Sequence, residues 1–325
     1  MKLIQSIVTV RLLMLSLVLF AAPTRHAQAT HTQETFANHP NQGGSSSATD
    51  DSTRRTARLR AAPNDELGSL QRFQTVRIIT LSPHLAEWVD AAGASTALVG
   101  VSKFTNYPSY TLSLPQVSDA GQLFIESIFA LKPTHVLAWK EGTPKQHLNK
   151  LKQLGLNVIV LSSAHLSDIS TGIKAIANIT HSTPAQAVAL PPKQTHQQTL
   201  NKPKALFFEV WSKPLMTLGA TQFLIEALGL CGLTTAFPTL TAPAVSVSPE
   251  AVVLAKPDIW LSFSDKAQSE LLKRVPTPAH WQAFSHLPFV QQQRSFLLNS
   301  DIFSRPTPRL IAAIPELCQQ LSTSY

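Results

Sequence analysis

The sequence predicts an α/β protein with two lobes, each built on a parallel β-sheet. Three observations predict this fold. Strand-like segments alternate with helix-like segments along most of the chain, the alternation starts again near residue 205, and one short segment occurs once in each half. Strands that alternate with helices are typical of a parallel sheet, because each helix returns the chain to the start of the next strand.

The first half opens with an apolar strand at residues 76–81, which stops at Ser82-Pro83. Apolar residues then recur at helical spacing from Leu85 to Ala92, and Gly93 ends that helix. Further strands are predicted at residues 97–101, 134–138 and 158–161, and further helices at residues 125–131, 145–154 and 169–179.

The second half follows the same order. Its predicted strands cover residues 205–210, 259–262 and 295–298, and its predicted helices cover residues 221–228, 249–255 and 310–321. Pro315 lies inside the last of these helices, where a proline removes a backbone hydrogen bond. We therefore expect a kink or a restart at that point.

A repeated segment links the two halves. Residues 126–133 read ESIFALKP and residues 250–257 read EAVVLAKP. Each copy leads into an apolar strand that ends in an aromatic residue, Trp139 or Phe263. We interpret the two copies as one supersecondary unit that is used once in each lobe.

The chain divides into five predicted regions. Residues 1–29 have the basic start, short apolar run and small residues of a cleaved signal peptide, which predicts secretion to the periplasm. Residues 30–72 are polar and too poor in large apolar residues to form a core, so we expect a disordered leader. The first lobe is predicted at residues 73–182, a bridging segment at 183–204, and the second lobe at 205–325.

Composition limits the function. The net charge is +8, but the basic residues are dispersed rather than interleaved with aromatics, which argues against nucleic-acid binding. The two cysteines, Cys231 and Cys318, are predicted to form one disulfide in an oxidising compartment. Neither has a second Cys or a His at the spacing of a metal site, so metal ligation is the weaker interpretation.

Four segments together resemble a known family. They read TLSPHLAE from residue 80, VGVSKFTNYP from residue 99, QVSDAG from residue 116 with the following Glu126–Trp139 stretch, and NSDIFSRPTPR from residue 299. They are similar to the cobalamin-binding periplasmic proteins of ABC importers, which belong to the helical-backbone class of substrate-binding proteins. The likeness covers roughly residues 76–321. Two departures are Pro191-Pro192 in the bridging segment and Ala120, where well-known members place a ligand-stacking tryptophan.

The resemblance implies two α/β lobes joined by a bridging helix, with the ligand in a cleft between them. Cobalamin is then the transported ligand, no cofactor is implied, and the partner is an ABC permease dimer in the inner membrane. A haem or a ferric siderophore remains the alternative ligand for the same class of protein. The family also implies that Glu126 and Glu250 dock to the permease, and we expect a monomer.

The ligand site can be placed from the residues themselves. Ligands bind beyond the carboxyl ends of the strands in open parallel sheets, and here aromatic residues follow those ends, which suits a large planar ligand. The predicted ligand-binding residues are Phe104, Trp139, Trp211, Asp301, Ile302, Phe303, Ser304 and Arg305. His84 invites the idea of a metal ligand, but we expect a solvated loop histidine and predict no metal site.

Three rival functions are weaker. The chain lacks the Gly-x-Ser-x-Gly, His-Glu-x-x-His, phosphate-loop and dinucleotide-binding motifs, so we expect no enzyme. A protein that binds a free metal ion needs His, Asp and Glu at the strand ends, where this chain places Phe and Trp. An adhesion module would show no saturable small-molecule site.

Overall fold

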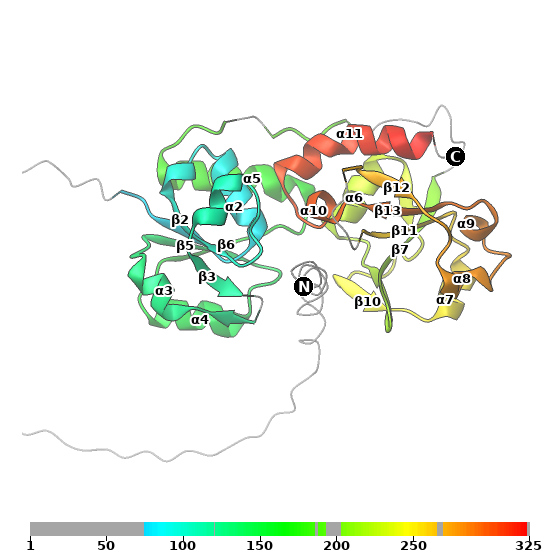
Figure 1. Ribbon diagram of the computed structural model, residues 1–325, viewed down its shortest axis with the longest axis horizontal. Helices are drawn as coiled ribbons and strands as arrows, with labels where there is room; N and C mark the ends of the chain where they lie inside the picture. The colour runs from blue at the N-terminus through cyan, green and yellow to red at the C-terminus, as the bar shows by residue number, and fades with distance from the viewer. Residues whose placement is uncertain (1–74, 120, 186–187, 193–202, 265–268, 324–325) are drawn as a thin grey trace, which may run out of the picture. The chain divides into compact units, whose positions relative to one another are not determined.

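The computed structural model describes residues 75–119, 121–185, 188–192, 203–264 and 269–323. The predicted signal peptide and leader, residues 1–72, therefore lie outside the described residues. Within the described part, two β-sheets with flanking helices follow one another along the chain (Figure 1). The predicted α/β class with two lobes is confirmed.

The first sheet has six strands in the order β4-β3-β2-β1-β5-β6. All neighbours run parallel except the short pair β3 and β4. The strands are β1 (Ile78–Thr80), β2 (Leu98–Ser102), β3 (Gln116–Asp119), β4 (Gln122–Leu123), β5 (His135–Trp139) and β6 (Val158–Leu161). The accompanying helices are α2 (Pro83–Ala91), α3 (Ile125–Ala130), α4 (Lys145–Gln153) and α5 (Leu166–Thr180), with two 3-10 turns at Ser95–Ala97 and Ser109–Ser113.

This strand order creates a switch point. The chain leaves β1 for β2 on one side of the sheet, and later enters β5 on the other side. Crevices form at such points because successive connections diverge over the carboxyl ends of the strands. The topology alone thus favours a ligand site beyond the ends of β1 and β5.

The second sheet has seven strands in the order β10-β8-β7-β11-β13-β12, with β9 also paired to β7. Its parallel centre consists of β9, β7, β11 and β13, and its antiparallel edges consist of β8, β10 and β12. The strands are β7 (Lys204–Ser212), β8 (Leu215–Leu218), β9 (Leu233–Thr235), β10 (Ala244–Ser246), β11 (Ile259–Phe263), β12 (Leu272–Arg274) and β13 (Ser295–Leu298). The helices are α6 (Phe223–Leu230), α7 (Pro249–Ala255), α8 (Ala279–Gln282), α9 (Pro288–Gln291), α10 (Ser300–Phe303) and α11 (Pro308–Ser322).

The repeated segment has the same local structure in both halves. It forms α3 followed by β5 in the first half, and α7 followed by β11 in the second. Both helices are followed by a lysine in the left-handed conformation, Lys132 at φ 45° and Lys256 at φ 47°. A left-handed residue commonly ends a helix, and the proline after each lysine prevents its continuation.

Two proline effects differ from each other. Pro315 lies inside α11, and the helix runs through it to Ser322, so of the two expected outcomes the restart is wrong and the kink stays a prediction. The apolar face of α11, including Ile311, Ile314 and Leu317, is buried in the core, and this packing outweighs the lost hydrogen bond. In the bridging segment, the described residues 183–185, 188–192 and 203 form no helix, in keeping with the Pro191-Pro192 pair.

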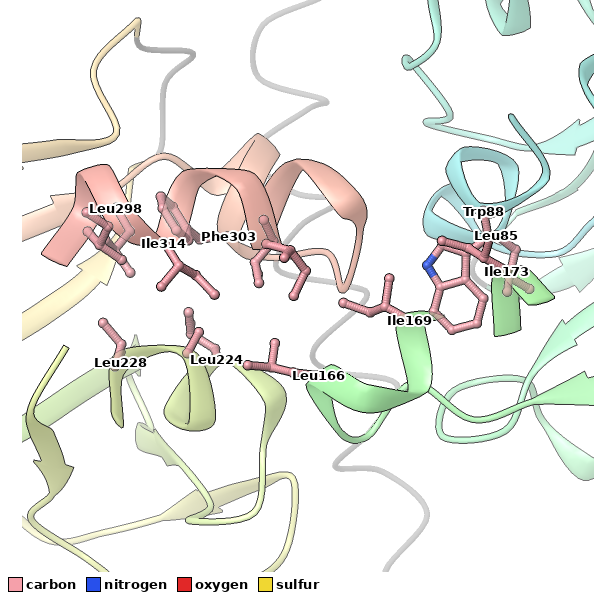
Figure 2. Close-up of a cluster of buried hydrophobic side chains, with 14 of the residues drawn as sticks. Leu85, Trp88, Leu166, Ile169, Ile173, Leu224, Leu228, Leu298, Phe303 and Ile314 are labelled. Carbon is pink, nitrogen blue, oxygen red and sulfur yellow. The ribbon is translucent and has the colours of Figure 1, made fainter. Parts of the chain in front are cut away.

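One continuous hydrophobic cluster connects the two halves. It contains residues of α2 and α5 from the first half and residues of α6, α10 and α11 from the second (Figure 2). Figure 2 shows Leu166 and Ile169 of α5 between Trp88 and Leu224. The Trp88 indole also donates a hydrogen bond to the carbonyl oxygen of Pro306 at 2.8 Å. The halves are therefore joined by packing as well as by the chain.

A disulfide joins Cys231, directly after α6, to Cys318 in α11, as predicted. Both cysteines are buried in the shared hydrophobic cluster. None of the described helices combines the length and the apolar character needed to cross a membrane.

Candidate functional site

A cavity opens at the carboxyl ends of β1, β2, β3 and β5, where the topology favours a site. Its walls come from the last residues of these strands, from the segments that follow them and from β4: Leu81, Ser82, Pro83, Ser102, Lys103, Phe104, Ser118, Asp119, Leu123, Trp139, Gly142, Thr143, Pro144 and His147. The cavity volume is about 40 Å³, which holds a few water molecules or one small polar group. The cavity is therefore too small to enclose a large planar ligand.

Trp139 forms one wall of this cavity. It is the last residue of β5, and its six-membered ring lies against the backbone of Gly142. A Cβ atom at residue 142 would come within 2.1 Å of the ring, so only glycine permits this contact. The backbone N–H of Trp139 is bonded to Thr143 at 3.0 Å, which fixes the turn after the strand.

Two buried polar atoms of the cavity walls lack a hydrogen-bond partner among the described residues. They are Nε1 of Trp139 and Oγ of Ser118. Leaving a buried polar group unbonded costs about 1–3 kcal/mol. An indole N–H can only donate, whereas a hydroxyl can donate or accept.

The charged residues of the cavity are paired or neutral. Lys103 and Asp119 form an ion pair at 2.8 Å. Partial burial lowers the pKa of His147, so its imidazole is neutral at pH 7.

Phe104 is held in an unusual backbone conformation. Its φ angle is 70°, a left-handed value that non-glycine residues rarely adopt. Lys103 lies over its ring, with Nζ 5.1 Å from the centroid. The carbonyl oxygen of Phe104 accepts a hydrogen bond from Nη2 of Arg305 at 3.3 Å. The strained loop after β2 is therefore fixed by a residue of the second half.

Arg305 serves the protein itself in this structure. Its Nη1 donates to the side-chain oxygen of Asn106 at 2.5 Å and lies 3.3 Å from Asp301. Its side chain is 15% exposed. Burial lowers the pKa of Arg305, although neighbouring carboxylates oppose that shift. Asp301 is in turn bonded by Asn106 at 3.0 Å.

The other predicted ligand residues lie in different surroundings. Phe303 is completely buried in the shared hydrophobic cluster, and Ile302 packs against that cluster. Ser304 donates to the carbonyl oxygen of Ser300 within α10. Trp211, near the end of β7, donates its indole N–H to the carbonyl oxygen of Lys213. Phe104 and Trp139 line the cavity, and Asp301 and Arg305 bond to Asn106 in the segment after β2. The ligand-binding role of all eight residues stays a prediction.

His84 requires a correction. It is not a solvated loop residue, because it belongs to α2 and is 4% exposed. Its ring meets Trp88 and Trp139 edge-on, each at 5.4 Å between centroids. Ser82 bonds to its Nδ1 at 2.9 Å. Burial, followed by the charge of Arg305, lowers the pKa of His84 to about 3.

The two predicted docking residues are both exposed. Glu126 is the second residue of α3, and Glu250 is the second residue of α7. The pKa of Glu250 is lowered by a hydrogen bond from the backbone N–H of Glu250 itself and by one from the side chain of Ser248. Each carboxylate thus lies in the first turn of its helix, where negative charge is favoured.

The sequence patterns did not single out Ser118, Gly142, or the ion pair of the buried Glu87 with the partly exposed Arg309. Ser118 lies in β3, one residue before its end, and Gly142 lies three residues after β5, so closeness to a strand end was the available signal. Glu87 and Arg309 belong to helices that are far apart in the sequence, and no local pattern connects them. Among the described residues, no three His, Cys, Asp or Glu side chains are grouped to hold a metal ion.

Comparison with known proteins agrees with this architecture. A family model described as "Periplasmic binding protein" matches residues 78–302. The vitamin B12-binding protein of Vibrio cholerae is 31% identical over 255 residues, which cover 77% of this chain and 90% of that protein. The vitamin B12-binding protein of Pectobacterium atrosepticum is 30% identical over 259 residues, covering 76% and 88%.

Solved structures give the same result for the fold. The crystal structure of the periplasmic vitamin B12 binding protein of Vibrio cholerae has a TM-score of 0.63 at 29% identity, covering 76% of this chain and 97% of that one. The periplasmic heme binding protein of Vibrio cholerae has a TM-score of 0.59 at 22% identity, covering 76% and 99%. At that lower identity the likeness concerns the fold alone.

Proposed function

The chain belongs to the periplasmic binding protein family, and on that premise we propose that it captures cobalamin and delivers it to an ABC importer. The observation that carries this proposal is the 31% identity to a vitamin B12-binding protein over 77% of the chain. Binding proteins of this family carry a ligand rather than transform it. Cobalamin is then cargo and not a cofactor.

The comparisons support cobalamin over haem. The vitamin B12-binding protein of Vibrio cholerae is 31% identical to this chain, whereas the periplasmic heme binding protein of the same organism is 22% identical.

Phe104 and Trp139 supply the apolar contact in this proposal. Both line the cavity, and aromatic faces bury much area with little loss of side-chain entropy. Arg305 bonds to the carbonyl oxygen of Phe104, and Gly142 leaves room for the Trp139 ring. We expect these contacts to preorganise the site, which reduces the entropy that is lost on binding.

A binding experiment tests the ligand. The purified chain is incubated separately with cyanocobalamin, haemin and a ferric siderophore, desalted, and examined by visible absorption. We expect it to retain one cobalamin per chain and little of the other two. Retention of haem or of the siderophore without cobalamin would replace the proposed ligand by that alternative.

A variant pair tests the site. Trp139→Ala should weaken cobalamin binding by about 2 kcal/mol, as for a buried aromatic anchor. Phe129→Ala is the matched control, because Phe129 is an aromatic residue on α3 that does not line the cavity. If the two variants bind cobalamin with equal affinity, Trp139 does not contribute to the binding site. Isothermal titration calorimetry measures both.

Delivery to the importer is the second part of the proposal. Glu126 and Glu250 occupy the same position in the two copies of the repeated segment, and both are exposed. One carboxylate per half fits a permease dimer with two equivalent basic patches. A Glu126→Ala/Glu250→Ala variant should bind cobalamin normally and lose most of its stimulation of the importer's ATPase. If this variant supports normal cobalamin uptake at limiting protein concentration, the two glutamates have no role in docking and only stabilise the starts of their helices.

Secretion completes the proposal. Residues 1–29 act as a cleaved signal peptide, and the mature chain works in the periplasm as a monomer. The mass of the protein recovered from a periplasmic extract tests the cleavage. Size-exclusion chromatography with light scattering tests the monomer.

A further inference from the structure

Asn106 of the first half bonds to two charged residues of the second half. Asn106 is an exposed residue of the segment after β2, Asp301 belongs to α10, and Arg305 lies in the turn after that helix. Nδ2 of Asn106 donates a hydrogen bond to Oδ1 of Asp301 at 3.0 Å. Oδ1 of Asn106 accepts one from Nη1 of Arg305 at 2.5 Å. A single side-chain amide therefore uses both of its ends on two predicted ligand residues.

The chemistry of the charged pair (Asp301 and Arg305) selects the kind of group that it binds. A carboxylate only accepts hydrogen bonds, and a guanidinium only donates them. The two atoms that meet Asn106 lie 3.3 Å apart, so the pair presents one acceptor beside one donor. A primary carboxamide complements this arrangement, because its NH2 group donates and its oxygen accepts. The Asn106 side chain is the carboxamide that occupies the pair in this structure.

Asn106 is the exchangeable partner of the charged pair. The Asp301 side chain is 42% exposed and that of Arg305 is 15% exposed, so the pair is open to solvent. Asp301 is also held by Arg309 at 2.9 Å, and Arg305 by the carbonyl oxygen of Phe104 at 3.3 Å. If Asn106 turns outward, water satisfies its amide while the other bonds keep the pair in place.

The charged pair lies next to the candidate site. Phe104 lines the cavity, Asn106 follows it by two residues, and Arg305 bonds directly to the Phe104 backbone. We therefore expect a ligand that contacts Phe104 to have the charged pair within reach of one of its side groups.

We propose that the Asn106 side chain takes the place of a ligand carboxamide and is displaced from Asp301 and Arg305 when the ligand binds. This inference rests on the proposed function, because the rim of a corrin carries several primary carboxamides. Asn106 then lowers the apparent affinity by competition, in proportion to the fraction of molecules in which the pair is open. It also sets specificity, because only a group with both a donor and an acceptor replaces the bonds that are lost.

Isothermal titration calorimetry with cyanocobalamin tests the sign of this effect. Asn106→Ala should bind roughly three to ten times more tightly than the wild type, about the effect of one ordinary hydrogen bond, because the competing amide is gone. A residue that only positions the Phe104 segment would weaken binding when it is truncated. Asn157→Ala is the matched control, because Asn157 is exposed and lies at the amino end of β6, away from the carboxyl ends of the strands.

A pair of corrin analogues tests the chemical class. Dicyanocobinamide keeps carboxamides on its rim, whereas dicyano heptamethyl cobyrinate carries esters, which accept hydrogen bonds but do not donate them. The wild type should bind the first more tightly than the second, and Asp301→Ala should reduce this preference. In the Asp301→Ala background, Asn106→Ala should no longer produce its full gain, because the ligand amide has lost its acceptor.

Three results would contradict these expectations in different ways. If Asn106→Ala binds cyanocobalamin no more tightly than the wild type, the competition is absent and the proposed function stands without it. An equal gain from Asn106→Ala with and without Asp301 would mean that Asn106 obstructs the ligand only by its bulk. A wild-type chain that binds none of these corrins would overturn the proposed function itself.

Discussion

Arg309 of α11 donates two hydrogen bonds to the buried carboxylate of Glu87 in α2, from Nε at 2.8 Å and from Nη2 at 2.6 Å. The two residues are 222 positions apart, so the pair joins the first half to the second. Arg309 also bonds to Asp301 at 2.9 Å and lies over the ring of Tyr107 at 4.2 Å. Burial opposes the charged form, but the bonds and charges of Glu87 and Asp301 outweigh it and raise the pKa of Arg309.

This pair gives the first prediction. Arg309→Met should lower the free energy of unfolding by up to about 3–5 kcal/mol, because the buried Glu87 carboxylate loses two hydrogen bonds and keeps only Arg305, 3.8 Å away, as a cation. Adding Glu87→Leu should restore much of that loss, since the poorly paired buried charge is then gone. Urea unfolding of both single variants and of the double variant measures the coupling. A double variant whose loss equals the sum of the single losses would show that the two residues act independently.

The second prediction concerns acid stability and His84. In the folded protein its pKa is about 3, while an unfolded chain has a histidine pKa of about 6.5. Below pH 6.5 the unfolded state binds a proton that the folded state does not bind. Stability should therefore fall as the pH is lowered from 6.5 toward 3, by up to about 1.4 kcal/mol per pH unit from this one group.

A His84→Gln variant isolates this contribution, because glutamine keeps a polar partner for Ser82 but does not titrate. The difference in unfolding free energy between wild type and variant should change with pH only below 6.5. Urea titrations at several pH values provide the curves. Parallel curves from pH 7 to pH 4 would mean that His84 takes up its proton without unfolding.

The burial of His84 could have been predicted from a sequence signal that was not used. The Ser82-Pro83 pair correctly predicts the end of β1, but Pro83 is at the same time the first residue of α2. A proline fits that position because the first helical N–H has no partner in the helix. His84 and Trp88 are four residues apart, so the helical spacing would have placed the histidine against the core.

The strands were predicted unevenly for a physical reason. Central parallel strands such as β5 and β11 are continuous apolar runs, and the sequence predicts them. The short strands β4, β9, β10 and β12 have two or three residues each, too few for an apolar pattern to show, and the pairing of β9, β10 and β12 depends on neighbours that are distant in the sequence. In the site, Trp139 follows from its place after a strand. The bonds of Arg305 do not, because Asn106 lies 199 residues away.

The disulfide provides the third prediction. Cys231 and Cys318 are 87 residues apart in the sequence. Reducing the bond should lower the free energy of unfolding by about 2–5 kcal/mol, mainly because the unfolded chain gains entropy. Unfolding with and without a reductant, beside a Cys231→Ser/Cys318→Ser variant, measures this loss. As a control, the unfolding free energy of the double variant should not change with the reductant and should equal that of the reduced wild type. Two free thiols in the protein recovered from the periplasm would contradict the disulfide.

The last prediction concerns a second contact between the halves, His165 with Glu226. His165 precedes α5, and its Nδ1 lies 2.5 Å from the carboxylate of Glu226 in α6. The same carboxylate accepts a hydrogen bond from the backbone N–H of Leu166 at 2.8 Å. The hydrogen bond and charge of Glu226 raise the pKa of His165. The contact therefore favours the protonated imidazole.

The sign of the pH dependence follows from that shift. Stabilisation from a raised histidine pKa is fully present below the unfolded value of about 6.5 and is lost as the pH rises through the folded value. The His165→Gln variant should therefore have a lower free energy of unfolding than the wild type at pH 6 and nearly the same free energy at pH 9. The effect should be small and sensitive to salt, because the imidazole is largely exposed. Glu226→Gln should abolish the same pH dependence, and its persistence in that variant would assign it to another group.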